Sequence, residues 1–134
     1  MKLFLDSSAV IELFKNNQGV VAAIEGADEV YTSSLCAYEV LVGEKYVDAK
    51  GMKSHFKEAA GFFETIATLP FDYSDAKKAA DVMAKLSAKG KKVPEMDALI
   101  AAQAEPLGLT ILTKDARHFD VISKETGLKM QTIG

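Results

Sequence analysis

The chain has 134 residues, of which 49% are hydrophobic and 26% are charged, and its formal net charge is −3. This length fits a single domain, residues 1–134, with its own buried core, and the composition argues against extensive disorder. The net charge argues against a protein that binds nucleic acid through bulk positive charge alone. Cys36 has no second cysteine to pair with, and Asp6 interrupts the apolar start. We therefore expect no internal disulfide, no signal peptide, no membrane span and a cytoplasmic location.

The first half of the chain alternates short apolar runs, typical of buried strands, with longer stretches typical of helices. We expect the following elements there: a strand at 2–5, a short helix through 10–14, a second short helix at 20–24, a strand at 29–32 and a helix that reaches about residue 48. Serines precede two of these helices and are candidate N-caps: Ser7 or Ser8 for the first, and Ser33 or Ser34 for the last.

The second half continues the same alternation. Its expected elements are a helix at 52–65, a strand near 68–71, a helix at 75–88 that starts from Asp72 or Ser74, an alanine-rich helix with Pro94 in its first turn that ends at Ala104, a strand at 109–113 and a short strand near 129–132. Strands that alternate with helices in this way predict an α/β fold with a parallel sheet.

Two aspartates, Asp6 and Asp115, lie just after predicted strands. An aspartate in this position is often simply the N-cap of the next helix, and this interpretation stays open for both residues. Ligands of open α/β sheets, however, bind at the carboxyl ends of the strands. Two acids at two strand ends are therefore candidate site residues.

Two further acids lie on helix faces that we expect to point inward. Glu39 shares its face with Leu35 and Val42, and a glutamate is seldom buried without a partner. Asp97 lies in the first turn of the alanine-rich helix, where the helix dipole alone favours an anion, but its neighbours three and four positions on are apolar. If the fold brings these four acids together, their mutual repulsion requires a divalent cation to offset it.

Four short motifs around these acids resemble those of the PIN-domain ribonucleases, and within that family the small VapC-type toxins of type II toxin–antitoxin pairs. The motifs are Leu5-Asp6-Ser7-Ser8, Glu39-Val40-Leu41-Val42-Gly43, Asp97-Ala98-Leu99-Ile100-Ala101-Ala102, and Thr113-Lys114-Asp115 with Phe119 following. Lys114 is a departure, because many relatives carry asparagine there. The resemblance spans nearly the whole chain and implies a single PIN-like domain, with a central parallel sheet of four to five strands flanked by helices in three layers (α/β/α).

The resemblance also implies the chemistry of the site. One or two Mg²⁺ or Mn²⁺ ions, hard cations that prefer carboxylate oxygen, would be held by four residues: Asp6, Glu39, Asp97 and Asp115. A metal-activated water would then cut RNA by in-line attack on phosphorus, with no protein nucleophile, as an endoribonuclease does. Ser7 and Thr113 would support the site by hydrogen bonding, although helix capping is an alternative role for Ser7.

Several cations near these motifs are candidate contacts for RNA phosphates: Lys91, Lys92 and Arg117. A solvated turn is the alternative for the two lysines, and a plain salt bridge is the alternative for the arginine. His118 invites a role as general base or ligand, but no third candidate joins His55 and His118 in an imidazole site. The resemblance further implies a homodimer and a cognate antitoxin that blocks the acidic site.

Other functions fit the same residues. A PIN-type nuclease in RNA processing or decay would use the same four acids, and a catalytically inactive PIN module would only bind RNA or protein. A phosphorylation-regulated receiver domain is also a small parallel α/β domain, but it requires a second acid beside Asp6 and an aspartate that ends the middle strand. Two serines follow Asp6, and the region at 69–71 is followed only by Asp72. The sequence therefore favours a metal-dependent ribonuclease that acts as a toxin.

Overall fold

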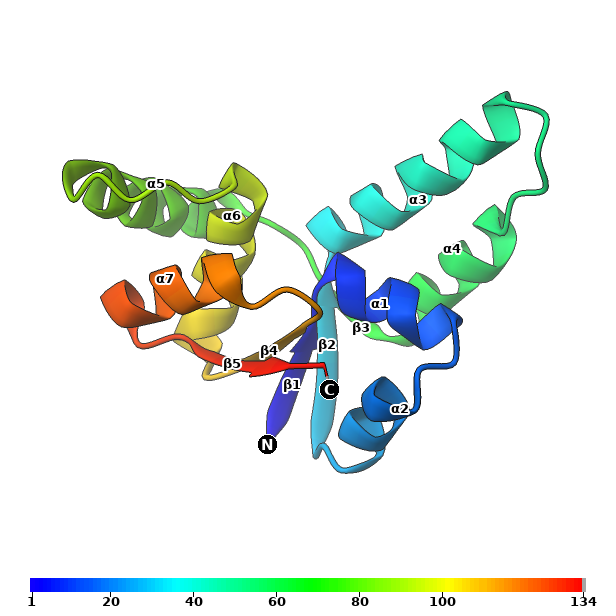
Figure 1. Cartoon of the computed structure of the whole chain (residues 1–134), viewed down its shortest axis with the longest axis horizontal. Coiled ribbons are helices and arrows are strands. Elements are labelled where there is room, and N and C mark those ends of the chain that lie inside the picture. The colour runs from blue at the N-terminus through cyan, green and yellow to red at the C-terminus, as the bar shows by residue number, and fades with distance from the viewer. Residues whose placement is uncertain (134) are drawn as a thin grey trace.

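A computed structural model describes residues 1–133 and has a parallel sheet of five strands at its centre (Figure 1). The strand order is β3-β2-β1-β4-β5, and every neighbouring pair is parallel. The strands are β1 (Lys2–Leu5), β2 (Glu29–Ser33), β3 (Ala67–Leu69), β4 (Thr110–Thr113) and β5 (Lys129–Thr132). The expected parallel sheet of four to five strands is confirmed.

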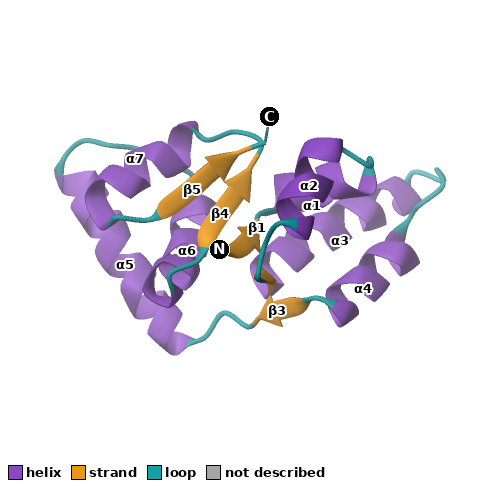
Figure 2. Cartoon of the chain, turned by 90° about the horizontal axis from the view of Figure 1, so that it is seen from below, coloured by secondary structure: helices purple, strands orange, loops and turns teal. Residues whose placement is uncertain are grey.

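Helices cover both faces of this sheet, which confirms the three layers (Figure 2). One side carries α1 (Ser7–Phe14), α2 (Gln18–Glu25), α3 (Ser34–Ala49) and α4 (Phe56–Thr65). The other side carries α5 (Tyr73–Ala88), α6 (Glu95–Ala104) and α7 (Arg117–Thr126). A short 3-10 turn, Glu105–Leu107, connects α6 to β4. Within residues 1–133, none of the helices combines the length and the apolar character that crossing a membrane requires.

Each face of the sheet is buried in its own apolar cluster, because successive side chains of a strand point to opposite faces. Phe4 and Ile111 lie in the cluster that contains residues of α5, α6 and α7. Leu3 and Leu5 lie in the cluster formed with α1 to α4. This two-sided burial explains why β1 and β4 appear in the sequence as uninterrupted apolar runs.

The strand order reverses between β1 and β4. From β1 the chain passes to α1 and later to β2, whereas β4 is reached through α6 on the opposite side and leads on to β5. In open α/β sheets, such a reversal creates a crevice at the carboxyl ends of the strands, where ligands bind. Asp6 follows β1 at this edge, and Thr113 ends β4 beside it.

Some expected boundaries were wrong. The helix expected at 52–65 begins at Phe56, because the preceding segment is held as a loop by side chains: Glu44 accepts a hydrogen bond from the His55 backbone at 2.9 Å. The helix α7 was not expected at all. Among the candidate caps, Ser33 and Asp72 are confirmed, since the Ser33 hydroxyl accepts from the Leu35 backbone and Asp72 forms a capping box.

Candidate active site

Asp6 directly follows β1 and caps α1, and this position fixes its carboxylate at the carboxyl edge of the sheet. Its Oδ1 accepts hydrogen bonds from the Ala9 backbone N–H at 2.8 Å and from the Ser8 hydroxyl at 2.6 Å. Asp6 therefore caps α1, which confirms the N-cap interpretation for this residue. The alternative prediction, that Ser7 or Ser8 caps the helix, was wrong. Asp6 is only 7% exposed, and burial raises its pKa even though its hydrogen bonds oppose the shift.

Glu39 is half-buried on α3 and contacts the first turn of α1. The Ser7 hydroxyl donates a hydrogen bond to its Oε1 at 3.1 Å. Burial raises the pKa of Glu39, and the negative charge of Asp6 raises it further, while the bond from Ser7 lowers it. Ser7 therefore hydrogen-bonds the Glu39 carboxylate, and Glu39 lies close enough to Asp6 for their charges to repel.

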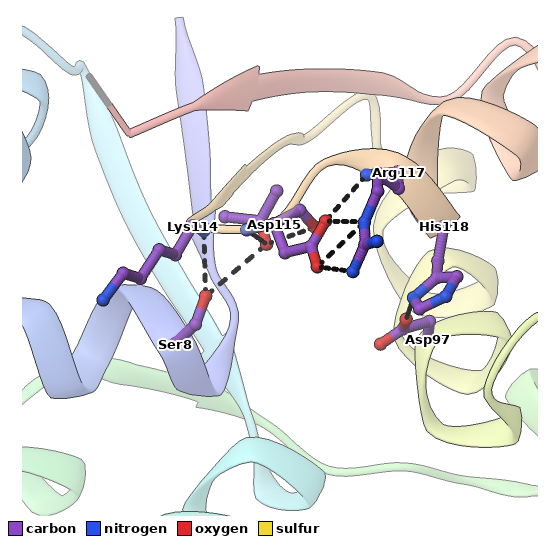
Figure 3. A network of polar contacts seen from close by, with 7 residues as sticks. Ser8, Asp97, Lys114, Asp115, Arg117 and His118 are labelled. Atoms are coloured by element: carbon purple, nitrogen blue, oxygen red, sulfur yellow. Dashed lines mark hydrogen bonds and ion pairs between the residues drawn. The ribbon is translucent and has the colours of Figure 1, made fainter.

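Asp97 reaches the same edge from the first turn of α6. Burial is the main cause that raises its pKa, and the charges of Asp6 and Glu39 add to the effect. His118, on the first turn of α7, opposes this shift, and its Nδ1 lies 3.3 Å from Asp97 Oδ2 (Figure 3). Three of the four candidate acids are thus electrostatically coupled although they come from β1, α3 and α6.

Asp115, the fourth acid, lies in the loop after β4 and is engaged by Arg117 (Figure 3). Arg117 Nε donates to Asp115 Oδ1 at 3.0 Å, and Arg117 Nη2 donates to Oδ2 at 2.7 Å. These bonds lower the pKa of Asp115 to about 2. The Asp115 side chain is half exposed, and both of its carboxylate oxygens accept hydrogen bonds from Arg117. Asp115 is therefore paired with Arg117, and this is the salt bridge that the sequence left as one alternative for the arginine.

Of the two candidate lysines, Lys91 forms an ion pair and Lys92 is exposed to solvent. Lys91 Nζ donates to Glu125 Oε1 at 3.1 Å, and Lys89 donates to the other oxygen of the same carboxylate at 2.6 Å. Both bonds tie the loop before α6 to α7. Lys92 is exposed beside them.

A polar network that the sequence did not predict connects α1 to the loop after β4. Ser8 accepts a hydrogen bond from the Lys114 backbone N–H at 2.9 Å, and its Oγ lies 3.5 Å from the hydroxyl of Thr113. The Lys114 side chain pairs with the buried Glu12 at 2.7 Å. The sequence feature that could have indicated this network is Glu12, a glutamate within the otherwise apolar run at 9–14. Thr113 also donates to the Asp115 carbonyl at 3.2 Å.

The donor set at this edge matches a hard divalent cation in its chemistry, because all the coupled groups are carboxylates whose charges are unfavourable without a counter-ion. In the part of the chain that the structure describes, no three His, Cys, Asp or Glu side chains are close enough to hold a metal ion. His118 lies against Asp97, and Arg117 against Asp115. Cys36 is fully buried, which raises the pKa of its thiol to about 12, so it is no candidate nucleophile.

A groove of about 670 Å³ adjoins Glu39 between α1, α3 and α4. Its apolar lining includes Ile11 and Phe14, which are 42% and 45% exposed. Three acids also line it, and they outnumber the basic residues there, Lys15 and His55: Glu39, Glu44 and Glu58. The groove therefore combines exposed apolar surface with negative charge and opens beside the coupled carboxylates.

The sequence is similar to those of known nucleases. A family model described as "PIN domain" matches residues 3–125. The chain is 26% identical over 123 residues to "tRNA(fMet)-specific endonuclease VapC" of Shigella flexneri, which covers 90% of this chain and 91% of that protein. It is 27% identical over 126 residues to "VapC ribonuclease Y4jK" of Sinorhizobium fredii, covering 88% and 90% of the two chains.

Solved structures share the fold. The crystal structure of DNA-bound VapBC from Salmonella typhimurium matches with a TM-score of 0.81 and 24% identity, over 100% of this chain and 99% of that one. VapBC2 from Rickettsia felis, bound to a DNA fragment from its promoter, matches with a TM-score of 0.77 and 16% identity, over 98% of each chain. At these identities the likeness establishes the arrangement of helices and strands.

Proposed function

The chain belongs to the PIN domain family, and from this premise we propose that it is a metal-dependent endoribonuclease that acts as the toxin of a toxin–antitoxin pair. The observation that carries the proposal is the coupling of Asp6, Glu39 and Asp97 at the carboxyl edge of the sheet. The two VapC relatives, one named as an endonuclease and the other as a ribonuclease, support the reaction class.

The electrostatics of the three acids favour a bound cation. Each carboxylate is partly or fully buried, and burial is the largest cause of its raised pKa. Removing a charge from water is costly unless an opposite charge compensates it. Mg²⁺ or Mn²⁺ would be held by Asp6, Glu39 and Asp97, with Asp115 joining them if Arg117 releases it.

The chain's own residues would hold and orient the reacting groups. When bound, Mg²⁺ or Mn²⁺ supplies an activated water for attack on phosphorus and stabilises the leaving oxygen. Ser8 fixes the carboxylate of Asp6, and Ser7 fixes that of Glu39. Lys92 and Arg117 would contact RNA phosphates, a role supported by their exposure and by their closeness in sequence to Asp97 and Asp115.

The groove beside Glu39 supports the proposed antitoxin partner. An amphipathic helix with a basic side chain would bury its apolar face on Ile11 and Phe14 and place its charge near Glu39. The solved structures with this fold include VapBC complexes, which supports the same kind of partner here. A second copy of the chain is a further proposed partner, as the resemblance implies.

The test is cleavage of total RNA and of initiator tRNA by the purified chain in Mg²⁺, Mn²⁺ or EDTA. We expect cleavage with either metal, none in EDTA, and a loss of at least about 100-fold in Asp6→Asn and in Asp97→Asn. Asp81→Asn, which removes an exposed acid on α5, is the matched control and should retain activity. Cleavage that persists in EDTA or in both site variants would contradict the proposal.

A further inference from the structure

Glu12 is a buried acid that the proposed reaction does not use. It lies on α1, 8% exposed, one turn after Ser8. Its carboxylate accepts from Lys114 Nζ at 2.7 Å through Oε1 and from Asn17 Nδ2 at 3.1 Å through Oε2. The bond from Lys114 is the largest of the causes that lower its pKa. The Glu12 carboxylate is held in one orientation, because each of its two oxygens accepts a hydrogen bond.

Lys114 is held on α1 at two points. Its side chain donates to Glu12. Its backbone N–H donates to Ser8 Oγ at 2.9 Å, as Figure 3 shows. Ser8 has one hydroxyl proton, which it donates to Asp6 Oδ1 at 2.6 Å. The same hydroxyl oxygen thus accepts from the β4–α7 loop and donates to the carboxylate at the end of β1. This chain of bonds joins two strand ends that lie far apart in the sequence.

In the sequence, Lys114 lies between two residues of the proposed site. Thr113 precedes it and ends β4, and Asp115 follows it. A lysine anchored at both its backbone and its side chain restricts where the adjacent Asp115 backbone can lie.

We propose that Glu12 and Lys114 are positioning residues for the acidic site: their ion pair holds the β4–α7 loop against α1, keeps Ser8 on Asp6 and keeps Asp115 at the carboxyl edge. The inference rests on the proposed metal-dependent function. The pair differs from the exposed pair on α5 in that its acid is buried: the Glu12 side chain is 10% exposed and the Lys114 side chain is 61% exposed, whereas the Asp81 and Lys85 side chains are 68% and 60% exposed.

The test compares Lys114→Met, Glu12→Gln and the double variant with wild type and with the control pair Asp81→Asn and Lys85→Met. Lys114→Met retains the backbone N–H, and Asn17 remains a partner of Glu12, so this variant should fold. Mn²⁺ affinity is measured by electron paramagnetic resonance, thermal unfolding is measured in EDTA, and kcat and KM are measured for RNA cleavage.

We expect Lys114→Met and Glu12→Gln each to weaken Mn²⁺ binding and lower kcat by about tenfold, with KM unchanged, as for residues that orient metal ligands. The double variant should be no worse than either single variant, because both remove one interaction. Lys114→Arg should retain the wild-type affinity, and the control pair should leave it unchanged.

Two failures are distinguishable. If wild type binds Mn²⁺ and the Glu12 and Lys114 variants bind it within twofold of wild type, with only the unfolding temperature lowered, the pair is merely structural and this inference is overturned alone. If wild type neither binds Mn²⁺ nor cleaves RNA, the proposed function fails, and the inference fails with it.

Discussion

At the residue scale, Asp6 combines a helix cap with a buried charge, and the two contributions can be separated by Asp6→Asn. Asparagine caps helices about as well as aspartate, so the variant keeps the bond from Ala9 and removes the charge. Because burial raises the pKa of Asp6 in the folded state, the folded chain binds more protons than the unfolded chain between the two pKa values. This contribution to stability is present below the ordinary carboxyl pKa and is lost as pH rises through the raised value.

We therefore predict that Asp6→Asn raises the midpoint of thermal unfolding in EDTA at neutral pH and flattens the decline of stability above about pH 4. Mn²⁺ at 100 times its dissociation constant should stabilise wild type by about 2.7 kcal/mol and the variant by less. Calorimetry with and without Mn²⁺ measures both effects. The prediction is wrong if wild type and variant have the same pH slope in EDTA.

Some features of the site could be predicted from the sequence, and others could not. Asp6 was recognisable because it ends an apolar run, and Glu39 because it interrupts an apolar helix face. The pairing of Glu12 with Lys114 was not predictable, since it joins positions 102 residues apart and depends on β1 lying beside β4. The engagement of Asp115 by Arg117 depends on local loop geometry, which residue spacing does not determine.

At the element scale, α7 is the helix that the sequence analysis missed. It has few apolar residues, of which Phe119 and Ile122 are buried at a helical spacing of three. Gly127, at a φ of 78°, ends the helix in the left-handed region that glycine adopts readily. That spacing and that glycine were visible in the sequence, but most of the other residues of the segment are polar, and no helix was predicted there. The longer helices were predictable because their apolar stripes repeat over several turns.

Helix α7 should nevertheless be essential to the layer that covers one face of the sheet. We predict that Ile122→Ala lowers the free energy of unfolding by about 2–5 kcal/mol, because it leaves a cavity at a fully buried position. Urea denaturation measures the change, and Val121→Ala, at a half-buried position of the same helix, should cost less. Equal and small losses in the two variants would mean that α7 packs only loosely.

At the scale of the whole molecule, the site lies where the strand order reverses, so residues from both helical layers meet at one edge. Asp6 and Glu39 come from the β1 and α3 side, whereas Asp97 and His118 come from α6 and α7. A parallel α/β fold was predictable from the alternation of strands and helices. The order of the strands was not, because apolar patterns do not encode which strands are neighbours. Asp6, Glu39 and Asp97 influence one another's pKa as a consequence of that order.

This arrangement concentrates negative charge on a chain whose net charge is already −3. RNA should therefore bind weakly without metal, because the acidic edge repels its phosphates.

Replacing Asp6 and Asp97 by asparagine changes the net charge from −3 to −1, since two carboxylates are lost. We predict that this double variant binds labelled tRNA several-fold more tightly than wild type in EDTA, measured by fluorescence anisotropy at two salt concentrations. Asp75→Asn with Asp81→Asn makes the same net change on α5 and should have a smaller effect. If both double variants bind tRNA more tightly by the same factor, the repulsion comes from the net charge of the protein and not from the acidic edge.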